Sequence, residues 1–267
     1  MEEGVPELGV LQEALGLSVT WVGHSTVLLE AGGVRLLTDP LLRPRLGPLR
    51  RVAPAAAPLD EAVDAILISH VHRDHLDVPS LRLVESRQLV VPRGSGAPLR
   101  RRGFAPVVEL DEDEELSVGE LTVRATHAAH RARRNPHSAS TPALGFLISG
   151  AGRLYFAGDT EVFDGMRELP PLDVALLPIW GWGPRLGRGH LDPRQAAEAL
   201  RLLRPRVAVP IHWGTYLRVG MSREEAVLRE PAERFERLAA ELAPEVTVRI
   251  LAPGERLEVA ADRGGGQ

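Results

Sequence analysis

The densest group of potential metal ligands in this sequence lies between residues 70 and 77. From Ser69 the chain reads Ser-His-Val-His-Arg-Asp-His-Leu-Asp, so three histidines and two aspartates fall within eight positions. Imidazole and carboxylate groups are preferred ligands of Zn²⁺ and similar divalent ions. The run follows the apolar segment Ala62–Ser69, which predicts a buried strand. A metal site is therefore a better interpretation than a histidine-rich surface turn.

The spacing within this run indicates two neighbouring ion positions. In an extended segment, residues i and i+2 point to the same side of the chain, so His70 and His72 can bind one ion. If the chain then turns, Asp74 and His75 can face a second ion close by.

The pattern His-x-His-x-Asp-His resembles the signature of the metallo-β-lactamase superfamily, and later segments match that family in the same order. The resemblance implies an α/β fold, a four-layer αββα sandwich, with a two-metal site at the edge between its sheets. It implies that His70, His72 and a third histidine bind the first ion. It also implies that Asp74, His75 and a final histidine bind the second ion, and that one aspartate bridges both.

The bridging aspartate and the final histidine each match one position. Asp159 comes directly after Gly158 at the end of a predicted strand, and His212 follows the apolar strand Val207–Ile211. Alone, Asp159 would indicate a turn or a helix N-cap, and His212 would indicate a structural histidine. Together with the upstream motif, both are expected to be metal ligands.

The third histidine has two candidates, His127 and His130. Members closer to the phospholipase D group carry Thr-Pro-Ala-Gln-His in this region, often with an arginine four residues after the histidine. His130 fits this pattern, because Thr126 lies four residues before it and Arg134 four residues after it. His127 falls where the proline would be. We expect His130 to be the ligand, and His127 stays open as the alternative.

Two segments near the N-terminus indicate which branch of the superfamily the chain resembles. Trp21–Thr26 and Leu37–Pro40 resemble a Gly-His-Ala/Ser-Thr and Thr-Asp-Pro pair. That pair is typical of the branch that holds ascorbate-6-phosphate lactonase and N-acyl-phosphatidylethanolamine phospholipase D. In this comparison Asp39 is expected to orient a ligating histidine. His24 is expected to support a ligand or face the substrate, or else to be a buried histidine bonded to the backbone.

A glycine- and tryptophan-rich segment, Trp180–Gly189, also resembles this branch. It is expected to close over a substrate, and His190 to contact or polarise that substrate. Arg131, Arg133 and Arg134 are expected either to hold a phosphate bidentately or to form a solvated basic loop.

These features predict a hydrolase that uses two divalent ions, most often Zn²⁺, with Mn²⁺ or Fe as alternatives. Two ions about 3.5–4 Å apart can bind a bridging water and lower its pKa toward ~7. The hydroxide would attack phosphorus or a carbonyl, with Asp74 as ligand and proton acceptor, Asp159 as bridge and His190 at the substrate. The expected substrate is a phosphodiester-type small molecule or lipid. The alternatives are a lactonase acting on a (phosphorylated) lactone, an RNA-processing nuclease and a metal-binding protein without activity.

Composition excludes several other classes of site. The chain of 267 residues contains no cysteine, which excludes disulfides and thiolate ligands, and all 32 basic residues are arginine, which excludes lysine Schiff bases. A net charge of -4 argues against a nucleic-acid partner. No secretion signal or long apolar run is visible, so we expect a cytoplasmic protein without a transmembrane segment.

Hydrophobic periodicity predicts one domain, with a core from about residue 18 to 255 and a disordered tail at Arg263–Gln267. Alternating strands and helices with ligand-type residues at strand ends favour two sheets covered by helices. The expected strands are Val19–Glu30, Val34–Asp39, Ala62–Ser69, Gln88–Val91, Pro106–Leu110, Leu121–Thr126, Leu144–Ser149, Arg153–Ala157, Val174–Pro178, Val207–Ile211 and Val246–Leu251. The expected helices are Pro79–Glu85, Ala97–Arg102, Pro193–Leu203 and Pro231–Leu242. Pro40–Pro58 is expected to be a loop, and Asp111–Glu115 a solvated turn.

Overall fold

The structure, a computed structural model, describes residues 16–55, 59–134, 140–181, 186–221 and 224–260. The predicted tail Arg263–Gln267 lies outside these residues. Two seven-stranded sheets account for most of the fold. The first has the order β17 (Arg256–Val259), β1 (Leu17–Gly23), β2 (Thr26–Ala31), β3 (Val34–Thr38), β6 (Ala65–Leu67), β7 (Leu89–Pro92) and β8 (Val107–Leu110).

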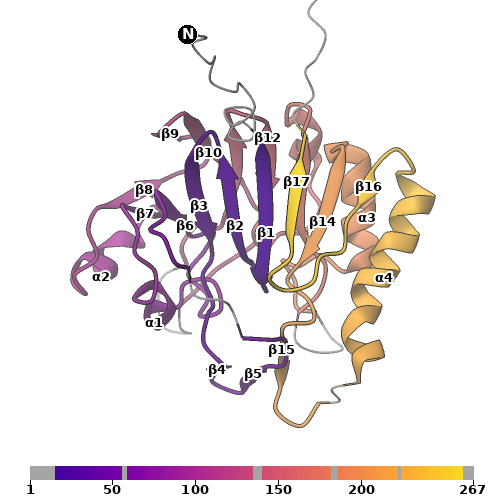
Figure 1. Cartoon of the computed structure of the whole chain (residues 1–267), viewed down its shortest axis with the longest axis horizontal. Helices are drawn as coiled ribbons and strands as arrows, with labels where there is room; N and C mark the ends of the chain where they lie inside the picture. Colours follow the sequence, from indigo (N-terminus) through magenta and orange to yellow (C-terminus); the bar gives the residue numbers. More distant parts are fainter. Residues whose placement is uncertain (1–15, 56–58, 135–139, 182–185, 222–223, 261–267) are drawn as a thin grey trace, which may run out of the picture.

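The second sheet lies against the first (Figure 1). Its order is β16 (Thr247–Val248), β14 (Val207–Ile211), β13 (Val174–Pro178), β12 (Arg153–Phe156), β11 (Leu144–Ser149), β10 (Leu121–His127) and β9 (Glu115–Val118). A small third sheet joins β15 (Tyr216–Arg218), β5 (Leu49–Arg51) and β4 (Arg45–Leu46).

Helices lie on the outside of both sheets. α1 (Val78–Leu81) and α2 (Gly96–Arg100) lie beside the first sheet, whereas α3 (Pro193–Leu203) and α4 (Glu225–Leu242) cover the second (Figure 1). A 3-10 helix, η2 (Asp164–Glu168), packs near α3. The expected four-layer αββα sandwich is therefore confirmed. Among the described residues, no helix is both long enough and apolar enough to cross a membrane.

Side chains along strands of the first sheet alternate between two hydrophobic clusters, one on each face of the sheet. In β2, Val27 and Leu29 join the main hydrophobic core, whereas Leu28 between them joins a second cluster with Leu81 of α1 and Leu99 of α2. Successive side chains of a strand point to opposite faces, so each strand of the first sheet contributes to both layers. Burial on both faces explains why these strands are almost continuously apolar.

The strand directions bring several chain segments to one edge. β3 is parallel to β6, and β12, β13 and β14 are parallel to one another. β1 and β10 are each separated from these parallel sets by one antiparallel strand, so they run in the same directions. The segments that follow β1, β3 and β6 therefore leave the first sheet at one edge, and those that follow β10, β12 and β14 leave the second sheet together.

Some predicted elements near the N-terminus differ from the observed ones. The predicted strand Val19–Glu30 is two strands, because Gly23 and His24 have φ values of 131° and 55° and turn the chain between β1 and β2. The continuous apolar sequence conceals this turn. The predicted loop Pro40–Pro58 contains β4 and β5, which pair with each other, and β5 also pairs with β15. Strands this short have no periodic signal in the sequence.

Two predictions near the C-terminus are also wrong. Pro231 does not start the last helix, because α4 begins at Glu225 and continues through it. A proline inside a helix removes one backbone hydrogen bond, and packing of α4 against α3 offsets this loss. Val246–Leu251 is not the last strand: only Thr247–Val248 pairs there, and β17 pairs with β1 beyond the predicted core limit.

Candidate metal centre

The first cluster of ligand-type atoms joins the segment after β6 to the segment after β10. His70 Nε2 lies 3.0 Å from His72 Nδ1, which lies 3.1 Å from His130 Nε2. These three nitrogens form one of the groups that can hold an ion. Two nitrogens bound to one tetrahedral Zn²⁺ at about 2.0–2.1 Å would be about 3.3 Å apart. The observed separations therefore fit convergence on a common ion.

A second cluster lies directly beside the first. His75 Nε2 lies 3.0 Å from Asp74 Oδ2, and His212 Nε2 lies 3.8 Å from the same oxygen. His24, from the turn between β1 and β2, belongs to this group as well. The predicted ligands Asp74, His75 and His212 are therefore brought together, although 137 residues separate the last two in the sequence.

Asp159 lies between the two clusters. Its Oδ2 is 3.7 Å from His70 Nε2 and 3.2 Å from His75 Nε2, and its Oδ1 is 3.4 Å from His212 Nε2. One carboxylate thus faces nitrogens of both sets, as a bridging ligand must. Gly158 turns the chain there with a φ of 60°, and a Cβ at this glycine would lie 2.8 Å from Ser69 Cβ.

Two buried atoms test whether a cation fits this centre. His75 Nε2 and Asp159 Oδ1 are buried and have no hydrogen-bond partner. An unpartnered buried polar atom is costly, and a divalent ion would satisfy both atoms. The donor set of imidazoles and carboxylates, without thiolates, suits Zn²⁺, Mn²⁺ or Fe.

The opposite nitrogens of several rings are held by fixed partners. His75 Nδ1 lies 2.7 Å from Asp39 Oδ2, and Asp39 Oδ1 accepts a hydrogen bond of 2.7 Å from the Ser69 amide. His130 Nδ1 donates to the carbonyl of Gly189 at 2.8 Å, and His212 Nδ1 donates to a backbone carbonyl at 2.6 Å. Such contacts fix the ring orientation and direct Nε2 toward the ion positions. Asp39 therefore lies where the sequence predicted it.

Burial keeps several of these histidines neutral. Burial, followed by the nearby His212, lowers the pKa of His24 to about 3. Burial likewise lowers the pKa of His130 to about 4 and that of His70 well below its usual range. Neutral imidazole is the form that binds metal ions.

The carboxylates of the centre remain ionised. Burial opposes ionisation of Asp159, but His212 and His75 outweigh it and hold its pKa well below the usual range. Burial also opposes ionisation of Asp74, whose pKa is lowered by His75 above all. Although burial acts the other way, Asp159 and Asp74 raise the pKa of His75. The two carboxylates therefore stabilise positive charge beside His75. A divalent ion would supply such a charge.

The structure separates the two candidates for the third ligand. His127 is exposed, its Nδ1 lies 3.0 Å from Glu112 Oε2, and its ring packs edge-on against Phe163. It belongs to neither cluster, whereas His130 faces His72. Ligation by His130 is therefore the arrangement that the geometry favours.

Two residues near the motif have structural roles instead. Arg134 donates to the carbonyls of Val71 and Leu76 at 3.2 and 2.6 Å, so it braces the 70–77 loop rather than presenting a phosphate site. Asp77, the second aspartate of the motif, caps α1 and forms two hydrogen bonds with Arg43. The expectation that Arg134 holds a substrate phosphate is therefore corrected.

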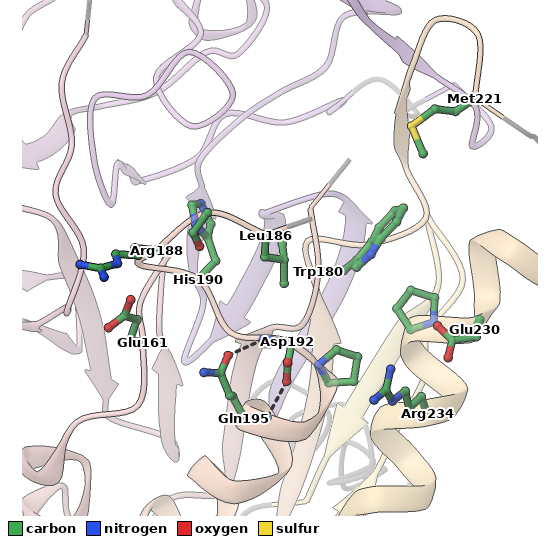
Figure 2. Close-up of a pocket in the computed structure, with 13 residues that line it drawn as sticks. Glu161, Trp180, Leu186, Arg188, His190, Asp192, Gln195, Met221, Glu230 and Arg234 are labelled. Atoms are coloured by element: carbon green, nitrogen blue, oxygen red, sulfur yellow. Dashed lines mark hydrogen bonds between the residues drawn. The ribbon is translucent and has the colours of Figure 1, made fainter. Parts of the chain in front are cut away.

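His190 lies where the centre meets a cavity of about 900 Å³. Its Nε2 is 3.3 Å from Asp159 Oδ2, and Figure 2 shows its ring beside Leu186 and the loop that carries Trp180. Although burial acts the other way, the hydrogen bond to Asp159 raises the pKa of His190. The lining of the cavity is mixed. Its apolar side chains are Trp180, Leu186, Pro193, Met221 and Pro231, and its charged side chains are Glu161, Arg188, Asp192, Glu230 and Arg234.

A second cavity, of about 630 Å³, lies beside the ligand candidate His130. Arg131 and Arg188 line it, and Arg188 and Glu161 line the larger cavity as well. Glu161 accepts a hydrogen bond of 2.6 Å from the Gly189 amide and so helps to hold this loop.

Sequence reasoning did not identify several lining residues, namely Glu161, Met221 and Arg234. None of them stands in a motif, and they come from separate loops and from α4. The expected substrate-closing segment Trp180–Gly189 does line the large cavity where it is described, but residues 182–185 lie outside the described residues.

Comparisons with known proteins agree with this arrangement. A model of the beta-lactamase superfamily domain matches residues 34–213. A protein of Mycobacterium tuberculosis is 35% identical over 92% of this chain and 70% of its own length. A metal-dependent hydrolase of Aeropyrum pernix is 34% identical over 90% of this chain and 96% of its own. The N-acyl-phosphatidylethanolamine-hydrolyzing phospholipase D 1 of Caenorhabditis elegans is 31% identical over 75% of this chain and 65% of its own.

Solved structures show the same fold. A metallo hydrolase of the archaeon Ignicoccus hospitalis has a TM-score of 0.68 and 25% identity, and the match covers 91% of this chain and 97% of that one. The family model spans more than half of the chain, and the Aeropyrum relative matches nearly all of it. The chain therefore belongs to the metallo-β-lactamase superfamily and is one of its metal-dependent hydrolases.

Proposed function

We propose that this protein hydrolyses a phosphodiester bond in a small molecule or lipid, at a centre of two divalent ions. The observation that carries the proposal is the cavity that opens at His190 (Figure 2), which combines apolar and charged side chains. The Nε2 of His190 lies 3.3 Å from Asp159 Oδ2, so the cavity reaches the metal centre. Such a cavity suits the apolar part of a substrate whose reacting group reaches the centre.

The first ion would be held by His70, His72 and His130, and the second by Asp74, His75 and His212, with Asp159 facing both sets. Zn²⁺ is favoured because the donors are mostly imidazole nitrogens, with Mn²⁺ or Fe as alternatives. When bound, the ions would supply Lewis acidity and a water of lowered pKa.

Two residues of the chain would accept the proton and contact the substrate. Asp74 lies at the second position with an ionised carboxylate, which suits it to accept a proton from the attacking water. His190 faces both the cavity and Asp159, so it would contact an oxygen of the substrate's reacting group.

Cationic side chains near the centre support an anionic substrate. Arg131 and Arg188 are exposed, line the cavity beside His130 and form no ion pair with any other described residue. Guanidinium groups bind phosphate oxygens bidentately. The Caenorhabditis relative is named for hydrolysing an N-acyl-phosphatidylethanolamine, which is a lipid phosphodiester and agrees with this substrate class.

A side-by-side assay tests the proposal. We expect the Zn²⁺-loaded protein to hydrolyse bis(p-nitrophenyl) phosphate slowly and faster than simple or phosphorylated lactones. Asp159→Ala should abolish turnover, since the two ion positions then lose the carboxylate between them. Arg188→Ala should raise KM about tenfold if the guanidinium positions the phosphate, whereas the exposed Arg133→Ala serves as control. Lactones turned over far better than any phosphodiester would show that the substrate class is wrong while the metal centre stands.

A further inference from the structure

His24 occupies the turn between β1 and β2 and is buried, with 2% of its surface exposed. Its φ is 55°, in the left-handed region, which Gly adopts readily and in which Asn, Asp and His are the most frequent of the other residues. Gly23 before it has a φ of 131°, and a Cβ there would lie 2.8 Å from Thr215 Cγ2. The chain therefore holds a histidine where the backbone would favour a smaller residue.

Backbone hydrogen bonds fix this turn against the segment that carries His212. The His24 amide donates to Thr215 Oγ1 at 2.8 Å, and the His24 carbonyl accepts from the His212 amide at 2.9 Å. The same carbonyl accepts from Trp21 Nε1 at 2.9 Å, and the Trp21 ring stacks on Trp213 with centroids 5.0 Å apart. The imidazole of His24 is thus placed by groups from both sheets.

The side chain of His24 faces the second ion position. Its Nε2 lies 3.1 Å from Asp74 Oδ2, and its ring centroid lies 3.9 Å from that of His212. As a hydrogen bond, this contact requires Nε2 of His24 to be the donor, because an ionised carboxylate has no proton to donate. The oxygen that receives it is also the Asp74 oxygen nearest to His75 Nε2.

Backbone geometry alone does not explain a histidine at this position. All the backbone contacts of His24 use its amide and carbonyl, which any residue possesses. Gly would adopt the left-handed φ more readily. The histidine side chain supplies an N–H group at the distance of Nε2, together with a ring that packs against His212.

We propose that His24 is a positioning residue for the second ion: its Nε2–H donates to Asp74 Oδ2 and holds that carboxylate toward His75 and His212. The inference rests on the two-ion centre proposed above. His24 acts through Asp74 and is not itself a ligand.

Two substitutions separate this role from a structural one. In His24→Gln the amide nitrogen reaches about as far as Nε2, whereas in His24→Asn it ends near the position of Nδ1. Asn tolerates the left-handed backbone better, so a role limited to the turn would favour His24→Asn. His127→Gln and His127→Asn at the exposed site are the matched controls.

The measurement is the affinity of both sites for Zn²⁺, by chelator competition, together with the absorption spectrum of the Co²⁺-loaded protein. His24→Gln should keep the second-site affinity within about threefold and leave the Co²⁺ spectrum unchanged. His24→Asn should weaken the second site about 10–100-fold, as expected when the partner of a ligand is lost. The first site and both His127 controls should be unaffected.

Equal second-site affinity in the two His24 variants would overturn the proposal. Loss of the second ion in His24→Gln, with a Co²⁺ spectrum of lower coordination number, would overturn it in favour of direct ligation. If neither variant folds, ¹H–¹⁵N spectra of the Zn²⁺-loaded wild type decide: protonated Nε2 at His24 supports the role, and protonated Nδ1 with metal-shifted Nε2 refutes it. None of these readouts needs a substrate, so the phosphodiesterase proposal can fail while this inference stands.

Discussion

His127 and His130 are three residues apart, yet they face different parts of the molecule. His127 is the last residue of β10 and points outward to Glu112. His130 lies beyond the strand end, where the bond from its Nδ1 to the Gly189 carbonyl turns its Nε2 toward His72. The two histidines differ in environment because β10 ends at His127, and only His130 lies in the segment beyond the strand.

The two histidines should therefore respond differently to truncation. We expect His130→Ala to lose the first ion and most activity, because two imidazoles cannot replace three as ligands. His127→Ala should retain both ions and near-wild-type turnover, since it removes only an exposed contact. Metal analysis after saturation with Zn²⁺ checks both. Loss of an ion in His127→Ala, with retention in His130→Ala, would reverse the assignment.

At the scale of elements, the 70–77 loop depends on a brace from a distant segment. Arg134, 64 residues after His70 in the sequence, donates to the carbonyls of Val71 and Leu76 at opposite ends of the loop. Burial lowers the pKa of Arg134, and the nearby Arg73 acts in the same direction. Its hydrogen bonds hold the loop in the shape that brings His72, Asp74 and His75 together.

Removal of this brace should weaken both the fold and the metal centre. We expect Arg134→Ala to lower the free energy of unfolding by about 2 kcal/mol, because two carbonyls lose a charged donor. For a domain of this size, that corresponds to a fall in Tm of roughly 4–8 °C. Thermal unfolding measures the effect, with the exposed Arg133→Ala as control. If Arg134→Ala unfolds like Arg133→Ala and only KM rises, Arg134 binds substrate after all.

The elements most accessible from the sequence are those with a strong local signal. Helix α3 (Pro193–Leu203) and strand β13 (Val174–Pro178) were predicted at their observed positions. In the structure, a capping box in which Asp192 and Gln195 bond each other's backbone begins α3. β4 and β5 were not, because strands of two or three residues have no periodicity. α4 shows a further limit: a favoured first-turn residue, Pro231, can lie in mid-helix when tertiary packing compensates.

At the scale of the whole molecule, the ligand set follows from sequence more readily than the cavity does. His70, His72, Asp74 and His75 stand in one motif, and Asp159 directly follows a strand, so order along the chain indicates them. Met221 and Arg234 line the large cavity only because a loop and α4 fold against the segment before His190. Such contacts depend on loop packing, which no local pattern encodes.

The protonation of the buried centre links stability to pH across the whole fold. Burial lowers the pKa of four histidines, so between those values and about 6.5 the unfolded chain binds more protons, and stability falls as the pH falls. The four are His24, His70, His72 and His130. The lowered carboxylate pKa values act in the same direction at lower pH. The pKa values of His75 and His190 are raised in the folded protein. Their contribution to stability is therefore present below about pH 6.5, and it is lost as the pH rises through the raised pKa values.

We expect the lowered groups to dominate between about pH 5 and pH 7.5, because four histidines oppose two and the carboxylates act only below this range. The metal-free protein should therefore have a lower Tm at about pH 5 than at about pH 7.5. Saturation with Zn²⁺ should raise Tm at the higher pH, since ions that bind only the folded state stabilise it. The gain should shrink at the lower pH, where protons compete for the imidazoles. Calorimetry of chelated and Zn²⁺-loaded samples measures all four values. A metal-free Tm that rises on acidification would show that His75 and His190 outweigh the rest, and a Zn²⁺ gain independent of pH would place the ion away from these histidines.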